Sequence, residues 1–294
     1  MKRTFLLIFF AALLLMPFSA FAEPAGSIDE LVAPYDSSKC VDCHEDIHKN
    51  WANSWHGKSI VDPRVLRTFR TFILSGLDKS KGTRKDLKDV CLPCHAPMIS
   101  NASDALINQI SDMIITAVDD VDLTKRASAV KELSKLNINC LGCHNLKGTP
   151  DGKPADKTIY APGISTDTPP HKEEFGYETV KTDFLKKSEF CATCHHGCGD
   201  LPSSECPTIY SSYKEKYLAH GGDKTCQQCH MKGGDEQSHK FPGIYEKDFA
   251  SEGIDIKLTT TPTQMVNHLE NKFVPTVVIN VQLTNLSGHG MPHG

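Results

Sequence analysis

The sequence is poor in the residues that usually fill a protein interior. Aromatic residues make up 7% of its 294 residues and hydrophobic residues 39%. A chain of this length normally buries a large aliphatic and aromatic core. We therefore expect another apolar body to occupy part of the interior.

After residue 22 the sequence has no apolar run long enough to span a bilayer, which takes about 20 residues. The start carries Lys2 and Arg3, an apolar run from Phe5 to Phe18, and then Ala20-Phe21-Ala22. This order predicts a cleaved signal peptide over residues 1–22, with an uncleaved anchor as the alternative. We expect an exported protein, in the periplasm or on the outer surface, that is not integral to a membrane after cleavage.

An excess of positive charge is also missing. The net charge is −4, and loss of Lys2 and Arg3 with the signal peptide makes it −6. Nucleic-acid binding requires a basic face, so nucleic acid is not an expected partner. An acidic chain can still dock on a basic protein surface.

Cysteine, in contrast, is abundant, with twelve residues. Ten of them form five Cys-x-x-Cys-His motifs, which we number 1 to 5 along the chain. The motifs are Cys40/Cys43/His44, Cys91/Cys94/His95, Cys140/Cys143/His144, Cys191/Cys194/His195 and Cys226/Cys229/His230.

This pattern is the attachment signature of haem c. Two thiols three positions apart add to the two vinyl groups of one haem, and the following imidazole binds the iron as the proximal ligand. Zinc also binds paired cysteines, but a zinc site does not need a histidine directly after each pair. Five motifs predict five covalently attached haem c groups, which would form the missing apolar core.

Cys198 and Cys206 remain, in a segment rich in Gly, Pro and Ser. In an oxidising compartment we expect them to form one disulfide. A metal or catalytic role is the alternative.

Local patterns predict a mainly α protein with long loops and a small C-terminal β region. Residues 103–136 have the periodicity of two helices, and residues 148–171 read as loop. Helices are expected over 177–187 and 210–219. Alternation around residues 254–258 and 277–283 indicates strands. We divide the chain into a pentahaem domain, 23–250, and a β-rich segment, 251–294, which is expected to continue in a longer protein or to pair with another copy.

Each haem iron commonly takes a second axial ligand. Met98 lies too close to His95 to cross its own haem, so histidine is the expected distal ligand. The candidates sit where Gly, Pro or a twelve-residue spacing lets the chain reach a neighbouring haem: His56, His171, His220, His239 and His289.

Several segments resemble multihaem c-type cytochromes related to the tetrahaem cytochrome of ammonia oxidation and to hydroxylamine oxidoreductase. They are CHEDIHKNWANSWHG, CHAP, SEFCATCHHG, TCQQCHM and TNLSGHGMPHG. The resemblance implies distal ligands in a W-x-x-S-x-H segment, here Trp51 to His56, and in an N-x-x-G-H-x-x-P-x-G segment, here Asn285 to Gly294. Five motifs differ from the four or eight of the best-known members.

These features predict an electron-transfer protein with a row of mostly bis-histidine haems and with redox proteins as donor and acceptor. The first alternative is a reductase or oxidoreductase of small nitrogen or sulfur species with one open haem. It is weakened because all five motifs end in His and none in Lys. The second alternative is a subunit of a homo-oligomer or extracellular filament.

Overall fold

The computed structural model describes residues 23–75, 83–163, 170–196, 209–232 and 238–291. The expected signal peptide and the Cys198–Cys206 disulfide lie outside these described residues.

Short helices joined by loops make up most of the described chain. The α-helices are α2 (Ile28–Val32), α3 (Glu45–Asn53), α4 (Pro63–Ser75), α5 (Thr83–Asp86), α6 (Leu92–His95), α7 (Asp104–Asp119), α8 (Leu123–Leu133), α9 (Pro170–Phe175), α10 (Ser188–His195), α11 (Ile209–Lys216), α12 (Cys226–His230) and α13 (Lys247–Gly253). The single turns of 3₁₀- or π-helix are η1 (Ala33–Tyr35), η2 (Cys40–Asp42), η3 (His56–Lys58), η4 (Leu87–Cys91), η5 (Pro97–Asn101), η6 (Ser134–Leu136), η7 (Gly142–Leu146), η8 (Phe184–Lys186) and η9 (Leu218–His220). The strands are β1 (Thr158–Ala161), β2 (Glu178–Lys181), β3 (Ile254–Asn267) and β4 (Lys272–Asn285).

The long helices α7 and α8 confirm the prediction for residues 103–136. The side-chain oxygen of Ser103 accepts a hydrogen bond from the Leu106 N–H at the start of α7, and that of Asp122 accepts one from Thr124 at the start of α8. Such caps satisfy free N–H groups of the first turn. One face of α7 is fully buried, because apolar residues recur at helical spacing.

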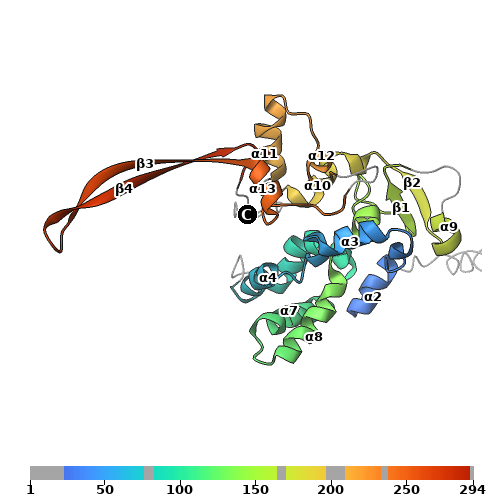
Figure 1. The fold of residues 1–294 in the computed structure, drawn as a ribbon. Helices are drawn as coiled ribbons and strands as arrows, with labels where there is room; N and C mark the ends of the chain where they lie inside the picture. The colour runs from blue at the N-terminus through green and yellow to red at the C-terminus, as the bar shows by residue number, and fades with distance from the viewer. Residues whose placement is uncertain (1–22, 76–82, 164–169, 197–208, 233–237, 292–294) are drawn as a thin grey trace, which may run out of the picture.

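The aliphatic core is confined to the first half of the chain. Its buried members all lie between Ala25 and Leu136, and about half of them belong to α4, α7 and α8, which lie together in Figure 1. From residue 150 to the end of the described chain, the buried hydrophobic side chains are Tyr160, Leu185 and Tyr213. The described part of the second half therefore lacks an aliphatic core of its own.

Three local predictions were wrong. The expected loop 148–171 contains β1, and the expected helix 177–187 is β2 followed by η8; β1 and β2 pair in parallel. This non-local pairing overrides the helical pattern of a short segment. Residues 78–88, DKSKGTRKDLK, read as a basic loop in the sequence, but the chain is helical from Thr83, and Leu87 is fully buried in the core.

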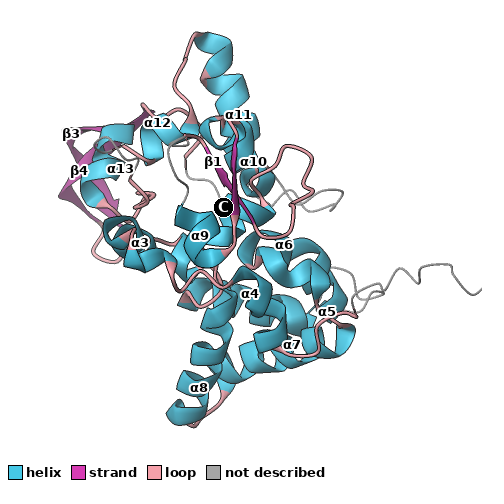
Figure 2. Cartoon of the chain, turned by 90° about the vertical axis from the view of Figure 1, so that its right-hand side faces the viewer, coloured by secondary structure: helices cyan, strands magenta, loops and turns pink. Residues whose placement is uncertain are grey.

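Strands β3 and β4 form a long antiparallel hairpin, which confirms the small C-terminal β region. In Figure 1 this hairpin projects away from the helices, with only its base near α11 and α13. Figure 2 shows the chain turned by 90°, with β3 and β4 seen along their length behind the helices. A search of the described residues finds no helix long and apolar enough to cross a membrane.

Candidate haem-binding sites

Each motif lies on a short helical turn. Motifs 4 and 5 occupy the ends of α10 and α12, while η2, η4 with α6, and η7 carry motifs 1, 2 and 3. Residues three apart on a helical turn lie on the same side. The fold therefore presents both thiols of each motif to one side, as attachment to one haem requires.

Four of the five motif histidines face a second histidine from a distant part of the chain. The ring centroids are 6.1 Å apart for His44 and His171, 6.3 Å for His144 and His239, 6.2 Å for His195 and His56, and 6.2 Å for His230 and His289. Three of the pairs are nearly parallel, at 15–27°, and the His56–His195 pair is at 81°. Four of the five sequence-predicted distal candidates are thus each opposite a motif histidine.

This separation fits an iron atom between the rings. An imidazole nitrogen binds a first-row transition metal at about 2.0–2.1 Å and lies about 1.1 Å from its ring centroid, so two axial imidazoles have centroids about 6.3 Å apart. Rotation about the metal–nitrogen axis does not alter this distance, so the parallel and perpendicular pairs fit equally well. Direct ring stacking, in contrast, would allow centroids closer than about 5 Å.

The outer nitrogens of these rings are held by acceptor oxygens. The Nδ1 atoms of His144, His230 and His289 lie 2.9, 2.8 and 2.9 Å from the carbonyl oxygens of Tyr160, Pro242 and Gly290. In His171, Nδ1 lies 3.2 Å from the Thr179 hydroxyl. A carbonyl fixes the proton on Nδ1, which leaves Nε2 with the lone pair that binds a metal. The sequence contained no signal for these acceptors.

His56 differs from the other distal candidates. Its buried Nδ1 has no hydrogen-bond partner, and an iron bound at this nitrogen would satisfy it. Burial, followed by the nearby His195, lowers the pKa of His56 to about 4. Burial is also the main cause that lowers the pKa of His144, His195 and His230. These rings are therefore neutral at pH 7, the form that binds metal.

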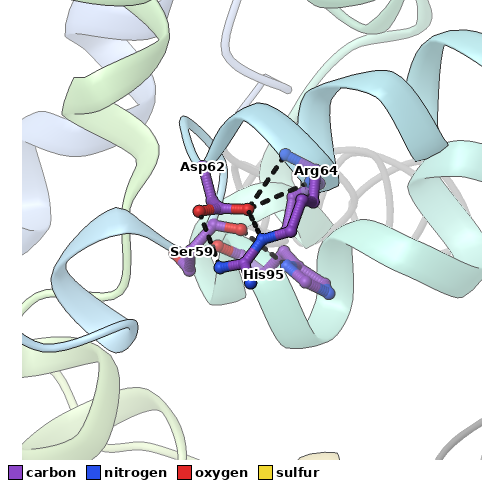
Figure 3. Close-up of polar contacts among 5 residues, drawn as sticks. Ser59, Asp62, Arg64 and His95 are labelled. Carbon is purple, nitrogen blue, oxygen red and sulfur yellow. Dashed lines mark hydrogen bonds and ion pairs between the residues drawn. The ribbon is translucent and has the colours of Figure 1, made fainter. Parts of the chain in front are cut away.

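His95 of motif 2 has a different environment. Its Nδ1 lies 2.6 Å from the Ser59 carbonyl oxygen, while the Ser59 hydroxyl donates to the His95 carbonyl at 2.7 Å (Figure 3). Phe69 packs edge-on against the ring at 5.0 Å. Among the described residues no histidine ring faces His95 in the way the other four motif histidines are faced.

The remaining candidate, His220, is exposed on η9 and contacts no other described histidine ring. The structure gives it no motif histidine to pair with. His196, next to motif 4, packs on Tyr210, and its Nδ1 lies 3.2 Å from the Ser211 hydroxyl.

Thiols of different motifs lie close enough to interact: Cys40 with Cys140, Cys94 with Cys194, and Cys191 with Cys226. Motifs 3 and 4 are also neighbours, since Cys143 lies close enough to Cys194 for their charges to interact. The five attachment points therefore form one connected set: motif 1 beside 3, motif 3 beside 4, and motif 4 beside both 2 and 5.

Buried polar contacts hold motifs 4 and 5 together. Gln227, within motif 5, is 2% exposed, and its Nε2 donates to the carbonyls of Leu185 at 2.9 Å and Lys187 at 2.7 Å, just before α10. The Cys226 N–H donates to the Ser188 hydroxyl, which donates to Tyr213. The two middle residues of a Cys-x-x-Cys-His motif carry no haem chemistry, so the motif alone gave no reason to single out Gln227.

Three of the ten predicted attachment thiols, Cys43, Cys91 and Cys229, are not among the described thiols that interact across motifs. Cys43 is exposed, and Cys91 and Cys229 are half-buried. Cys43 and Cys229 lie on the same helical turns as the first thiols of their motifs, Cys40 and Cys226. Their role in haem attachment stays a prediction from the motifs.

The positions of Cys43 and Cys229 on their helical turns explain why neither thiol is fully buried. Cys43 ends η2, a turn with no buried residue, so the chain around it remains at the surface. In α12 the buried side chain is Gln227, and Cys229 follows two positions later. Two residues rotate a helix by about 200°, which turns Cys229 away from the buried side. Each thiol therefore leaves room for a large apolar group beside it.

The zinc alternative finds no geometric support in the part of the chain that the structure describes. No cluster of three or more His, Cys, Asp or Glu side chains there could hold a bare metal ion.

No protein-family model matches the sequence, and no curated protein matches it. Among solved structures, the chain is similar to a penta-haem cytochrome c552 from Thermochromatium tepidum, with 20% sequence identity and a TM-score of 0.55. The similarity covers 88% of this chain and 67% of that one. The chain therefore has the fold of a multihaem cytochrome c.

Proposed function

We propose that the chain binds five haem c groups through its five motifs and transfers electrons along them. The observation that carries the proposal is the connected set of motifs, since each attachment point lies near the next one (motif 1 to 3, 3 to 4, and 4 to 2 and 5). Close spacing of redox groups is what one-electron transfer between them requires. The motif resemblance to the tetrahaem cytochrome and hydroxylamine oxidoreductase group supports the same class.

The ten motif cysteines, with Cys43 and Cys229 among them, would form the thioether bonds, and the five motif histidines would be proximal ligands. His171, His239, His56 and His289 would be the distal ligands at motifs 1, 3, 4 and 5, respectively. When bound, haem supplies a reversible one-electron couple whose potential the axial ligands set. The residues of this chain fix its position, exclude water around the rings and, through the Nδ1 acceptors, raise the electron donation of the ligating imidazoles.

We further propose that the protein acts outside the cytoplasm, as its first 22 residues and its haem c motifs favour. Its acidic mature chain fits redox protein partners with basic docking surfaces.

A second candidate function concerns motif 2. His95 faces no described histidine, which favours an iron with one open axial position. An open iron binds small ligands, so a reductase or oxidoreductase of small nitrogen or sulfur species would act at this haem. The absence of a distal imidazole among the described residues at motif 2 is the single observation that favours this candidate over pure electron transfer.

The test is to express the chain in a host that attaches haem c and to record its intact mass, its electron paramagnetic resonance spectrum and its nitric oxide binding. The expected result is a mass increase of five haems, four low-spin haems and one high-spin haem. A mass increase of fewer than five, or a chain with free motif thiols, would contradict the proposal. Five low-spin haems that bind no nitric oxide would exclude the second candidate and leave electron transfer.

The distal ligands are tested by His56→Ala, which should convert one further haem to high spin because it removes one axial imidazole. His171→Ala should do the same at motif 1. The matched control is His220→Ala, since this histidine is exposed and unpaired with a motif histidine; its spectrum should equal that of the unaltered protein. A low-spin spectrum retained in His56→Ala would remove this residue from the ligand set.

A further inference from the structure

The β3–β4 hairpin has one apolar and one polar face. Side chains of directly paired residues lie on the same face of an antiparallel ladder, and alternate pairs lie on opposite faces. The register therefore sorts the side chains without ambiguity. One face carries the pairs Ile254–Asn285, Ile256–Leu283, Leu258–Val281, Thr260–Ile279, Pro262–Val277, Gln264–Pro275 and Val266–Phe273. We call it the apolar face of the hairpin.

The apolar face has no charged residue along the whole hairpin. The opposite face carries Asp255, Lys257 and Lys272 and is otherwise largely Thr, Asn and Gln, with Val274, Val278 and Met265 as its apolar members. A surface strand that meets water on both sides would not need this separation. This separation of apolar and polar side chains indicates that another protein surface packs on the apolar face.

Nothing in the described part of the chain covers the apolar face. Its side chains are far more exposed than is usual for a soluble strand: Ile256 58%, Leu258 65%, Phe273 68%, Ile279 60%, Val281 57% and Leu283 67%. Figure 1 shows the hairpin standing clear of the helices over most of its length. An isolated two-stranded hairpin is marginally stable at best in water. A contiguous apolar patch of this size marks an interaction site.

We propose that the apolar face packs against the same face of a second copy of this chain. The area agrees with such a dimer: the six side chains above, together with Val277, expose roughly 800 Å² if a fully exposed side chain of this size presents about 190 Å². A standard stable interface buries about 800 Å² on each partner. Two strands of 14 residues, each about 45 Å long, also provide a flat surface that fits a second hairpin in the manner of a β-sandwich.

Charge favours a second copy over a different protein. A two-fold contact places one surface against itself, so any charge on that surface would meet its like. The apolar face has none, which satisfies this condition. It equally offers no charge that would select an acidic or a basic partner. The proposal goes beyond electron transfer, because it does not depend on how many haems the chain carries.

The test compares two substitutions of adjacent residues on β3. Leu258 lies on the apolar face and Thr259 on the opposite face, and both are exposed in the single chain. Leu258→Lys should shift the haem-loaded protein from dimer to monomer in sedimentation equilibrium at micromolar concentration, with at least a tenfold weaker dimer. The control Thr259→Lys should leave the dimer intact, because its side chain points away from the contact.

A second pair on β4 guards against a local folding effect. Val281 and Asn280 are the cross-strand partners of Leu258 and Thr259, so Val281→Lys should act like Leu258→Lys and Asn280→Lys like Thr259→Lys. The haem absorbance of each variant reports whether the helical part has folded. Unaltered protein that is monomeric at about 50 µM or higher, on the order of the concentrations where weak interfaces form, would overturn the proposal. Equal dimer loss in all four variants would overturn it as well.

Discussion

At the scale of the residue, the candidate sites depend on histidines that are kept neutral and correctly turned. Burial lowers the pKa of the motif histidines His95, His144, His195 and His230, and backbone carbonyls hold Nδ1 of three of them. Both effects leave Nε2 free with its lone pair. The sequence pattern names these histidines, but the acceptor oxygens that orient them come from segments elsewhere in the chain.

Asp62, which lies outside the candidate sites, holds the start of α4 in the segment between His56 and His95. Asp62 precedes Pro63, the first residue of α4, and its carboxylate accepts hydrogen bonds from the backbone N–H groups of Arg64 and Val65 and from the Arg64 guanidinium at 2.9 and 3.1 Å (Figure 3). The Arg64 guanidinium also lies 4.1 Å from the ring centroid of Tyr245. The hydrogen bond from Arg64 is the main cause that lowers the pKa of Asp62.

We predict that Asp62→Asn lowers the free energy of unfolding by less than about 1 kcal/mol at pH 7, because the asparagine oxygen still accepts from the backbone N–H groups and only the partly exposed ion pair with Arg64 is lost. A carboxyl with a depressed folded pKa stabilises the protein above its unfolded pKa of about 3.9, and this stability is lost as the pH falls through the folded pKa. The variant should therefore lose less stability below about pH 4 than the unaltered protein. Thermal unfolding by circular dichroism between pH 2.5 and 7 measures both effects.

The control for this prediction is Asp223→Asn, a change in an exposed loop. Its unfolding curve should follow that of the unaltered protein at every pH. If Asp62→Asn kept the same acid dependence as the unaltered protein, the cap would not be the source of it.

At the scale of the element, the second half of the chain is held by polar contacts between short helices rather than by an aliphatic core. The helix α12 has a capping box, in which Thr225 accepts from Gln228 N–H and the Gln228 side chain accepts from Thr225 N–H. Gln227 then ties α12 to the segment before α10 through two carbonyls. Contacts of this kind fix the relative position of motifs 4 and 5.

We predict that Gln227→Leu destabilises the protein by about 2 kcal/mol. The substitution leaves the buried Leu185 carbonyl without a donor, while the Lys187 carbonyl keeps the hydrogen bond from the Phe190 N–H, and a buried unsatisfied group costs about 1–3 kcal/mol. The adjacent Gln228→Leu is the matched control, because Gln228 is exposed and loses only a capping contact of less than about 1 kcal/mol. Differential scanning calorimetry of the haem-loaded variants measures both changes; equal effects would show that the buried carbonyl contacts are not decisive.

At the scale of the whole molecule, the two halves differ in what fills them. Residues 25–136 enclose an aliphatic core, whereas the part after residue 150 buries few hydrophobic side chains. In three of the four histidine pairs, the histidine that faces the motif histidine comes from this second part. Burial of apolar surface is the dominant stabilising contribution to folding. The second half must therefore obtain most of it from the cofactors and from the partner proposed for the hairpin.

We predict that chain produced without haem attachment keeps a folded first half and loses the second. Limited proteolysis followed by mass spectrometry should leave a resistant fragment of about residues 23–146 and digest the remainder, because cleavage follows the population of opened chain. The haem-loaded protein should resist cleavage over both halves, apart from the hairpin tip. A haem-free chain that is equally resistant in both halves would contradict this division.

The sequence by itself determined the chemistry of attachment and the class of fold. Five Cys-x-x-Cys-His motifs, a shortage of aromatic residues and the alternation around residues 254–258 and 277–283 are local signals, and local signals can be read without a structure. The helices α7 and α8 were predictable for the same reason, since each buries one stripe at helical spacing and has its own cap.

Only the tertiary structure decided which histidine faces which motif. His171 lies opposite His44 and His239 opposite His144, over separations along the chain that no spacing rule covers. The same holds for the thiols, because five identical motifs gave no sign of which motifs would lie beside one another. It holds also for β1 and β2, which exist because they pair with each other. Contacts between distant segments are set by the packing of the whole chain, so the free energy that selects them is absent from any single segment of sequence.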